Sequence, residues 1–192
     1  MNTTLKQFGF PPHPVDSYKY LVGDGIVNLV VRALPANHRT EATINRVIAA
    51  ERQEYDRNWA SKTCPYEGIP ELLDALTERK IPICILSNKP DEFTQVIVKR
   101  FLAKWKLSAV RGANDETPIK PDPSGAIRIA AALNLSPSVF LYCGDSCTDM
   151  ETAKAAGMLP VGVLWGFRLK DELIRAGAKM LIEHPRDLLN LV

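Results

Sequence analysis

The stretch that decides the fold spans residues 139–149 and reads Val139-Phe140-Leu141-Tyr142-Cys143-Gly144-Asp145-Ser146-Cys147-Thr148-Asp149. Its first five residues form a short apolar run, which predicts a strand buried on both faces of a sheet. A polar loop follows, and residues 149–156 have the pattern of a helix that Gly157 ends. A second apolar run at 159–165 predicts the next strand, so strand and helix alternate here.

The same alternation extends over the chain from residue 70 onward. Apolar runs predict strands at residues 81–86, 108–112, 139–143 and 159–165. Helical patterns lie between and after them, at residues 70–79, 91–102, 124–133, 149–156, 169–176 and 185–191. Because strands that alternate with helices are typical of βαβ units, the sequence predicts an α/β fold with a parallel sheet covered on both faces.

Residues 1–62 differ, since they carry helical periodicity and no convincing strand. The spacing of one apolar helix face is present at Ile26, Leu29, Val30 and Ala33. A longer helical segment at 40–60 is rich in charge, and we expect its far end, which includes Glu51, to be solvated. A stretch with Pro and Gly at 63–68 predicts a linker. We therefore expect a helical domain at 1–62 and an α/β domain at 63–192.

Composition and charge exclude several classes of protein. The 192 residues include 24 basic and 22 acidic side chains, and a net charge of +2 gives no electrostatic case for binding nucleic acid or an anionic membrane. No apolar run approaches the roughly 20 residues of a membrane helix, and the first residues lack the apolar segment of a signal peptide. We expect a cytoplasmic protein with neither a nucleic-acid nor a membrane partner; the sequence does not indicate the oligomeric state.

The four cysteines do not indicate a disulfide framework in a chain of this length. Cys84 and Cys143 lie inside apolar runs, where cysteine packs as a small hydrophobe. A metal site at Cys143 and Cys147 lacks a second pair of ligands and a nearby histidine, so we do not expect one.

Polar residues follow three of the predicted strands, and ligands of open parallel sheets bind at the carboxyl ends of strands. Ser87 and Asn88 follow the first strand, Lys120 lies in the loop after the second, and Asp145 and Asp149 follow the third. A carboxylate suits Mg²⁺, which takes few protein ligands together with water and substrate phosphate. A lysine and short hydrogen-bond donors suit the remaining phosphate oxygens. The combination indicates phosphoryl chemistry.

Each of these residues also has a purely structural interpretation. Ser87 or Asn88 could cap the helix after Pro90, and Asp145 or Asp149 could cap the helix that follows them. Lys120 could be a solvated loop lysine. Taken singly these interpretations are the more common ones, but all of them together on one sheet edge would be an unusual coincidence.

The sequence resembles the haloacid dehalogenase superfamily, and most closely its phosphoglycolate phosphatase branch. Ser87-Asn88, Lys120 and the Gly144-Asp145-Ser-x-x-Asp149 string look like motifs two, three and four of that superfamily. Strings similar to those of the branch also occur at residues 65–69, 87–90, 141–145 and 161–166, and a further one at 21–25 lies in what would be a helical cap. The resemblance covers nearly the whole chain.

The resemblance implies a Rossmann-like core with a helical cap and a Mg²⁺-dependent hydrolysis of a small phosphorylated metabolite, 2-phosphoglycolate, through a phosphoaspartyl enzyme. Ser87, helped by Asn88, would bind phosphoryl oxygens, and Lys120 would neutralise charge on nucleophile and phosphate. Asp145 would bind Mg²⁺, and Asp149 would support the metal site or hold Lys120. The loop of the cap is implied to close over the leaving group and help to select the substrate; its residues are Gly23, Asp24 and Gly25.

The sequence departs from the family at one point. The family begins with a strand that ends in Asp-x-Asp-Gly-Thr, whose first Asp attacks phosphorus, and this sequence contains no Asp-x-Asp. We therefore expect the first core strand and the nucleophile to be absent from this chain, with Met1 an internal methionine of a longer protein.

Two hypotheses of different class follow from this departure. The chain is either a phosphatase represented without its first strand, inactive or nearly so as given, or a binding-only relative that keeps a phosphate and Mg²⁺ site.

In the family the missing strand lies between the strands at 81–86 and 139–143. We expect the isolated chain to be of low stability, and these two strands to pair directly in any ordered structure.

Overall fold

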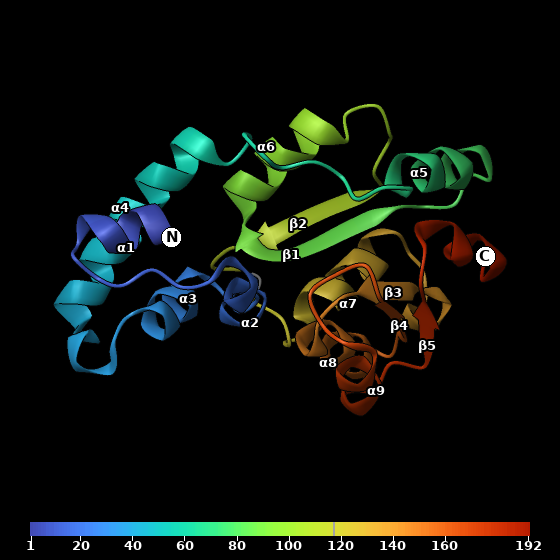
Figure 1. Ribbon diagram of the computed structural model, residues 1–192. Coiled ribbons are helices and arrows are strands. Elements are labelled where there is room, and N and C mark those ends of the chain that lie inside the picture. The colour runs from blue at the N-terminus through green and yellow to red at the C-terminus, as the bar shows by residue number, and fades with distance from the viewer. Residues whose placement is uncertain (117) are drawn as a thin grey trace. The chain divides into compact units, whose positions relative to one another are not determined.

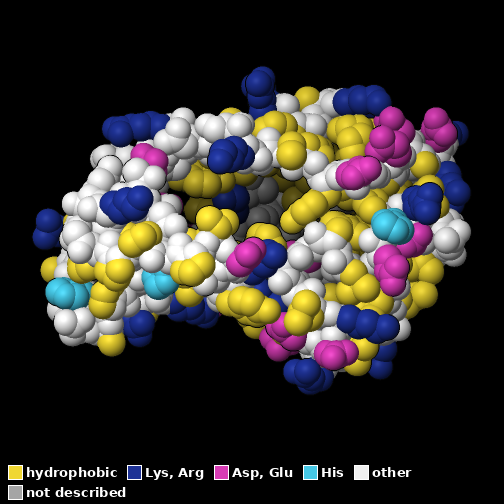
Figure 2. Space-filling view, viewed as in Figure 1, with side chains coloured by type: hydrophobic (Ala, Val, Ile, Leu, Met, Phe, Trp, Pro, Cys, Tyr) yellow, Lys and Arg dark blue, Asp and Glu magenta, His cyan; other side chains and the backbone are white. Residues whose placement is uncertain are grey.

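The computed structural model describes residues 1–116 and 118–192, and it divides into two compact units, residues 1–64 and 65–192 (Figure 1). No helix in the described part of the chain is both long enough and apolar enough to cross a membrane. Basic and acidic side chains are interspersed over the face seen in Figure 2.

The first unit is helical, as the sequence predicts. Its α-helices are α1 (Asn2–Gln7), α2 (Tyr18–Leu21), α3 (Ile26–Ala33) and α4 (Glu41–Asn58), with short 3-10 turns at Val15–Ser17 and Ala36–His38. Thr40 caps α4, because its hydroxyl accepts a hydrogen bond from the Thr43 N–H at 3.3 Å. This cap sets the start of the longest helix in the described chain.

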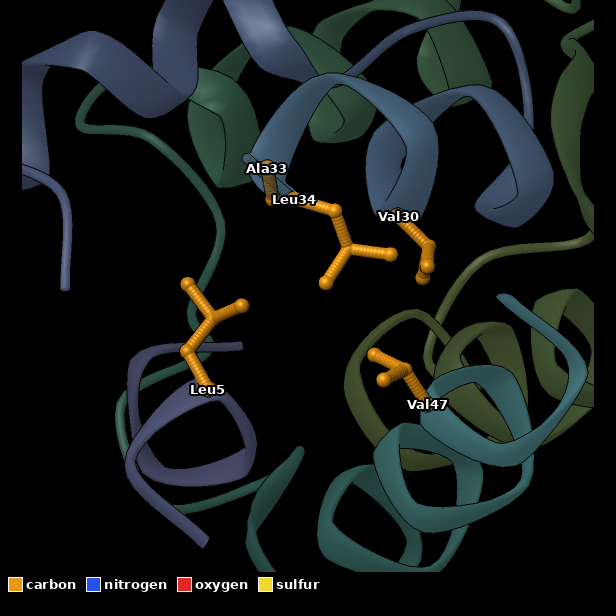
Figure 3. Close-up of a cluster of buried hydrophobic side chains, with 5 residues drawn as sticks. All are labelled: Leu5, Val30, Ala33, Leu34 and Val47. Atoms are coloured by element: carbon orange, nitrogen blue, oxygen red, sulfur yellow. The ribbon is translucent and has the colours of Figure 1, made fainter. Parts of the chain in front are cut away.

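Apolar side chains from three helices form the core of the first unit (Figure 3). Leu5 comes from α1, Val47 from α4, and Val30 and Ala33 from α3, whose apolar face was predicted from their spacing. The prediction that Glu51 is solvated is wrong. Its side chain is buried, and its two carboxylate oxygens accept hydrogen bonds from the Thr4 hydroxyl at 2.5 Å and the Met1 amino group at 2.8 Å.

The second unit alternates strands and helices, which confirms the predicted α/β class. Its strands are β1 (Cys84–Pro90), β2 (Ala109–Ala113), β3 (Leu141–Gly144), β4 (Leu159–Val163) and β5 (Met180–Ile182). Its helices are α5 (Ile69–Glu78), α6 (Asp91–Phe101), α7 (Ser124–Ala132), α8 (Cys147–Ala155) and α9 (Lys170–Ala176), with 3-10 turns at Pro137–Val139 and Pro185–Asn190. The sequence did not indicate β5, and the predicted terminal α-helix is a 3-10 turn.

The five strands form two separate parallel sheets, one with the order β1-β2 and one with the order β3-β4-β5 (Figure 1). The prediction that the strands near residues 81–86 and 139–143 pair directly is therefore wrong. In the described residues β1 pairs only with β2, and β3 pairs with β4 on one side only. Among the described strands, none pairs with the other edge of β1 or of β3.

The burial of the strands reflects this arrangement. β4 has a strand on each side, and four of its five residues are buried. Every described residue of β1 is only half-buried, and Cys143 of β3 is exposed, which corrects the expectation that Cys143 packs as a buried hydrophobe. Residues of β1 and β3 instead line a cavity of about 490 Å³ inside the second unit.

Candidate active site

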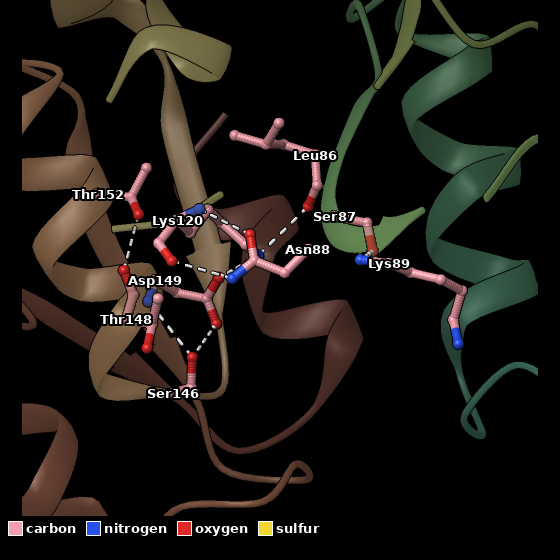
Figure 4. Close-up of polar contacts among 9 residues, drawn as sticks. All are labelled: Leu86, Ser87, Asn88, Lys89, Lys120, Ser146, Thr148, Asp149 and Thr152. Carbon is pink, nitrogen blue, oxygen red and sulfur yellow. Dashed lines mark hydrogen bonds and ion pairs between the residues drawn. The ribbon is translucent and has the colours of Figure 1, made fainter. Parts of the chain in front are cut away.

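A buried ion pair lies beside the open edges of β1 and β3 (Figure 4). The Lys120 ammonium is 2.7 Å from Asp149 Oδ1, and the two side chains are only 14% and 8% exposed. The same ammonium donates to the Leu86 carbonyl of β1 at 3.3 Å. Lys120 is therefore not a solvated loop lysine, and it connects β1 to α8.

The second carboxylate oxygen of Asp149 is held by the turn that begins α8. The Ser146 hydroxyl donates to Asp149 Oδ2 at 2.6 Å and accepts from the Asp149 N–H at 3.3 Å, so Ser146 is the helix cap. Gly144 permits this geometry, since a Cβ there would lie 2.2 Å from the Asp149 Cβ. With both oxygens engaged and the side chain buried, Asp149 is fixed in place and oriented toward Lys120. Burial, and then the charge of Asp149, raise the pKa of the nearby Tyr142 hydroxyl.

Asn88 fixes the loop that carries the lysine. Its side-chain oxygen accepts from the Lys120 N–H at 2.6 Å, and its side-chain N–H₂ donates to the Lys120 carbonyl at 3.0 Å. This two-point pairing makes Asn88 a positioning group for Lys120. The adjacent Ser87 accepts from the Lys89 N–H at 3.1 Å, which leaves the Ser87 O–H able to donate to a ligand.

Asp145 follows β3, and a backbone N–H of the loop after β4 holds its side chain. Its Oδ2 accepts from the Phe167 N–H at 2.9 Å. Gly166 lies directly beneath the carboxylate, since a Cβ on Gly166 would lie 2.3 Å from the same oxygen. In the described chain no other hydrogen bond reaches this carboxylate, so Oδ1 remains available to a ligand.

Comparison with known families assigns the chain to one of them. The family model described as haloacid dehalogenase-like hydrolase matches residues 1–163. The chain belongs to that family. The resemblance drawn from the sequence motifs is thereby confirmed at the level of the family.

Individual relatives of this haloacid dehalogenase-like chain lie at 30% identity or below. An N-acetylmuramic acid 6-phosphate phosphatase of Pseudomonas aeruginosa is 30% identical over 139 residues, which are 72% of this chain and 62% of that protein, so the chain spans less than two thirds of its length. A phosphoglycolate phosphatase of Mannheimia succiniciproducens is 26% identical over 198 residues, 100% of this chain and 88% of that protein.

Solved structures agree on the fold. A crystal structure from Lactobacillus delbrueckii subsp. bulgaricus, described as a candidate phosphoglycolate phosphatase, has a TM-score of 0.92 at 25% identity and covers 99% of this chain and 88% of its own. A haloacid dehalogenase-like family hydrolase from Streptococcus pneumoniae has a TM-score of 0.87 at 19% identity, with 98% and 86% covered. The second of these likenesses concerns the fold alone.

Members of this family are typically Mg²⁺-dependent, and the side chains of this site supply some of the ligands that Mg²⁺ needs. Mg²⁺ is commonly bound through one or two carboxylates, with water and substrate phosphate completing its shell. Asp145 supplies one carboxylate with a free oxygen, whereas both oxygens of Asp149 are engaged. In the described residues no group of three or more His, Cys, Asp or Glu side chains could hold a metal by itself. The ion would therefore depend on the substrate and on further ligands.

Hydrogen bonds bring together three of the residues expected at the site, Asn88, Lys120 and Asp149, and Ser87 and Asp145 are chain neighbours of this network. The capping interpretations are wrong for α6 and α8: α6 has no side-chain cap, and α8 is capped by Ser146. The sequence analysis missed Ser146, Gly166 and Phe167. The Ser-x-x-Asp spacing of 146–149 is a capping signal that could have identified Ser146.

The predicted cap loop lies in the first unit. Gly23 and Gly25 have positive φ values of 126° and 92°. The Asp24 carboxylate is paired with the Arg32 guanidinium through both terminal nitrogens, one of them at 2.7 Å. Asp24 thus anchors this loop to α3 through an ion pair that remains partly exposed.

Proposed function

We propose that the chain carries the main part of a Mg²⁺-dependent phosphomonoester hydrolase whose substrate is 2-phosphoglycolate. The observation that carries the proposal is the buried Lys120–Asp149 pair, held at 2.7 Å, whose ammonium also donates to the carbonyl of Leu86, the residue before Ser87. A positively charged group that is fixed in place and partly desolvated can stabilise the negative charge that develops on a phosphoryl group during transfer. Residues 63–192 would be the catalytic core and residues 1–62 the cap.

Each side chain has one role in this proposal. Lys120 neutralises charge on the phosphoryl oxygens, Asp149 keeps its ammonium in place, and Ser87 donates a hydrogen bond to the phosphate. Asn88 acts in the first place on Lys120, whose backbone it holds at both polar atoms. Asp145 binds Mg²⁺, which supplies electrostatic stabilisation of the transferring group.

The attacking group is proposed to come from outside residues 1–192. Phosphoryl transfer to an enzyme needs a carboxylate that forms a bond to phosphorus as the alcohol leaves, and water then releases phosphate from the acyl phosphate. The sequence offers no Asp-x-Asp for this step. We therefore propose that the nucleophile belongs to a segment encoded upstream of Met1, and that the 192-residue chain alone turns over little or no substrate.

The choice of 2-phosphoglycolate rests on relatives. A protein named phosphoglycolate phosphatase aligns with 100% of this chain at 26% identity. The relative at 30% identity is named for a different phosphomonoester, N-acetylmuramic acid 6-phosphate, so both compounds belong in the test. The loop at Gly23, Asp24 and Gly25 is the proposed selector between such substrates.

The experiment compares two proteins: residues 1–192, and the chain extended by its in-frame upstream coding sequence. Phosphate release from both phosphomonoesters is measured with and without Mg²⁺. The proposal expects Mg²⁺-dependent turnover by the extended chain only, which Lys120→Ala and Asp145→Asn abolish. An extended chain that binds phosphate and Mg²⁺ but turns over neither substrate would support the binding-only hypothesis instead. Robust turnover by residues 1–192 would show that another nucleophile acts.

A further inference from the structure

The end of β1 is irregular where it reaches the candidate site. Leu86 pairs with Arg111 in the regular part of the ladder between β1 and β2. The next pair joins Pro90 to Ala113, so the ladder advances four positions along β1 but only two along β2. Residues 87–89 therefore bulge opposite a single residue of β2. Bulges are frequent beside active sites, where they re-aim side chains, and this one contains both residues of β1 that the proposed function uses.

Side chains of α6 satisfy the backbone groups that this bulge leaves without a ladder partner. Asp91 Oδ1 accepts a hydrogen bond from the Gly112 N–H at 2.6 Å. The Thr94 hydroxyl, in a side chain that is buried, donates to the carbonyls of Lys89 at 3.2 Å and Pro90 at 3.1 Å. Because buried backbone groups without a partner are costly, these two side chains hold the bulge in its shape.

Gly112 lets the start of α6 approach β2 closely enough for this bonding. A Cβ on Gly112 would lie 2.4 Å from the Asp91 Cα and 2.7 Å from the Lys89 carbonyl oxygen. Both of these are backbone atoms, so no side-chain rotation could relieve the contact. The bulge, β2 and the first residue of α6 are thus packed against one another, and Asp91 bonds across the contact.

The bulge sets the directions of the site residues within it. Ser87 Oγ accepts from the Lys89 N–H at 3.1 Å, so the Ser87 hydroxyl is tied to the residue whose carbonyl Thr94 holds. Asn88 points toward Lys120, with which it pairs, whereas Lys89 points away from it (Figure 4). A bulge that relaxed would therefore turn the Ser87 hydroxyl away from its present direction.

We propose that Asp91 is a positioning residue of the phosphate site, which holds the bulge through Gly112 and thereby orients the Ser87 hydroxyl. Thr94 supports the same bulge. The inference rests on the proposed function, since that function assigns phosphate binding to Ser87. In the described chain only Oδ1 of Asp91 accepts hydrogen bonds, from Gly112 and from the Gln95 side chain at 3.3 Å. One carbonyl oxygen is enough for this role, so Asn can replace Asp91.

The charge of Asp91 gives the test a decisive sign. Asp91→Ala removes a negative charge near an anion site, so charge alone predicts tighter binding of phosphate. Positioning predicts the opposite: the dissociation constant of phosphate should rise about tenfold or more, as for one lost hydrogen bond to a charged group. Glu92→Ala is the matched control, because Glu92 is the other acidic residue in the first turn of α6 and is exposed. It should not weaken phosphate binding.

Calorimetry with inorganic phosphate and Mg²⁺, on the 192-residue chain, measures these dissociation constants. Asp91→Asn keeps the acceptor oxygen and should retain the affinity that Asp91→Ala loses. Thr94→Val removes a hydroxyl without changing charge and should also weaken binding, whereas Thr94→Ser should not. Thermal melts followed by circular dichroism check that each variant folds. If Asp91→Ala does not fold, the two Thr94 variants provide the same comparison.

A double variant distinguishes positioning from a general loss of structure. If Asp91 acts through Ser87, the variant Asp91→Ala/Ser87→Ala should bind phosphate no more weakly than Ser87→Ala alone. Additive losses would overturn the inference. So would unchanged or tighter binding by Asp91→Ala, equal weakening by Glu92→Ala, or no binding of phosphate by the parent chain.

Turnover by the upstream-extended chain separates this inference from the proposed function. A phosphate affinity that depends on Asp91 and Ser87, in a protein that hydrolyses neither phosphomonoester, would support positioning and count against the proposed chemistry. Turnover and phosphate affinity that are the same with and without Asp91→Ala would support the chemistry and refute positioning.

Discussion

Replacing Lys120 by Met should destabilise the second unit far more than an ordinary loss of an ion pair. The substitution leaves the Asp149 carboxylate, 8% exposed, without its counter-ion, although the Ser146 hydroxyl still donates to it. Removing one partner of a buried pair costs about 3–5 kcal/mol, and we expect a loss near the lower bound because Ser146 remains. For a chain of this size that corresponds to a fall in Tm of about 6–12 °C.

Lys104→Met is the matched control, since it breaks another lysine–aspartate pair of the same unit. Lys104 lies 2.7 Å from Asp74, the same separation as in the buried pair, but its side chain is 67% exposed and that of Asp74 43% exposed. Water screens this pair, so its loss should change stability little. Urea unfolding followed by circular dichroism measures both variants.

The double variant Lys120→Met/Asp149→Asn completes the test. It removes the unpaired charge, so much of the lost stability should return if the cost comes from an uncompensated carboxylate. Equal effects of Lys120→Met and Lys104→Met, or no recovery in the double variant, would refute the reasoning.

Three further substitutions test other parts of the structure. Gly166→Ala would place a Cβ 2.1 Å from the Asp145 Cβ. If Asp145 binds Mg²⁺, the affinity for Mg²⁺ measured by calorimetry should fall about 10–100-fold. Phe167→Ala keeps the backbone N–H and should change that affinity little. Cys143 is exposed toward the cavity, but the apolar groups around its thiol desolvate it and raise its pKa to about 11. The folded state therefore holds this proton more tightly than the unfolded one, and the wild type should lose stability relative to Cys143→Ala as the pH rises from about 9 to 11, measured by urea unfolding. Glu51→Gln weakens the buried hydrogen bond from the Thr4 hydroxyl and should cost about 1.5–3 kcal/mol in a thermal melt. No such loss is expected in Glu41→Gln, on the exposed start of α4.

The sequence predicted the elements of the second unit because its apolar runs and helix patterns are local signals. The run at 139–143 overlaps β3, and the run at 159–165 overlaps β4. β5 was missed because Met180–Ile182 has only three residues, too few for a periodicity to be visible. Strand ends shifted by up to four residues, and at β3 the 3-10 turn Pro137–Val139 occupies the predicted start of the strand.

What the sequence could not predict depends on contacts between distant residues. Glu51 lies in a charged stretch that is typical of a solvated helix end. Its contact with Thr4, 47 positions away, makes it a buried hydrogen-bond acceptor. Pairing of β1 with β3 was expected because open strand edges are costly. Local sequence patterns do not indicate where one sheet lies relative to the other. In the structure β1 and β3 line a cavity instead of pairing.

A substitution of Lys120 would affect both the stability of the fold and the proposed chemistry, whereas a substitution of Ser87 would affect mainly the chemistry. Lys120 is bonded to Leu86 and Asn88 of β1 and to Asp149 of α8, so it joins the first sheet to the helix that follows β3. A loss of activity on substituting Lys120 would therefore mix misplacement of both sheets with loss of a charge. In the part of the chain that the structure describes, the Ser87 hydroxyl is engaged only by the Lys89 N–H, within the same strand. Its hydroxyl can be removed with little effect on packing, and phosphate binding by Ser87→Ala is thus the measurement that isolates chemistry from architecture.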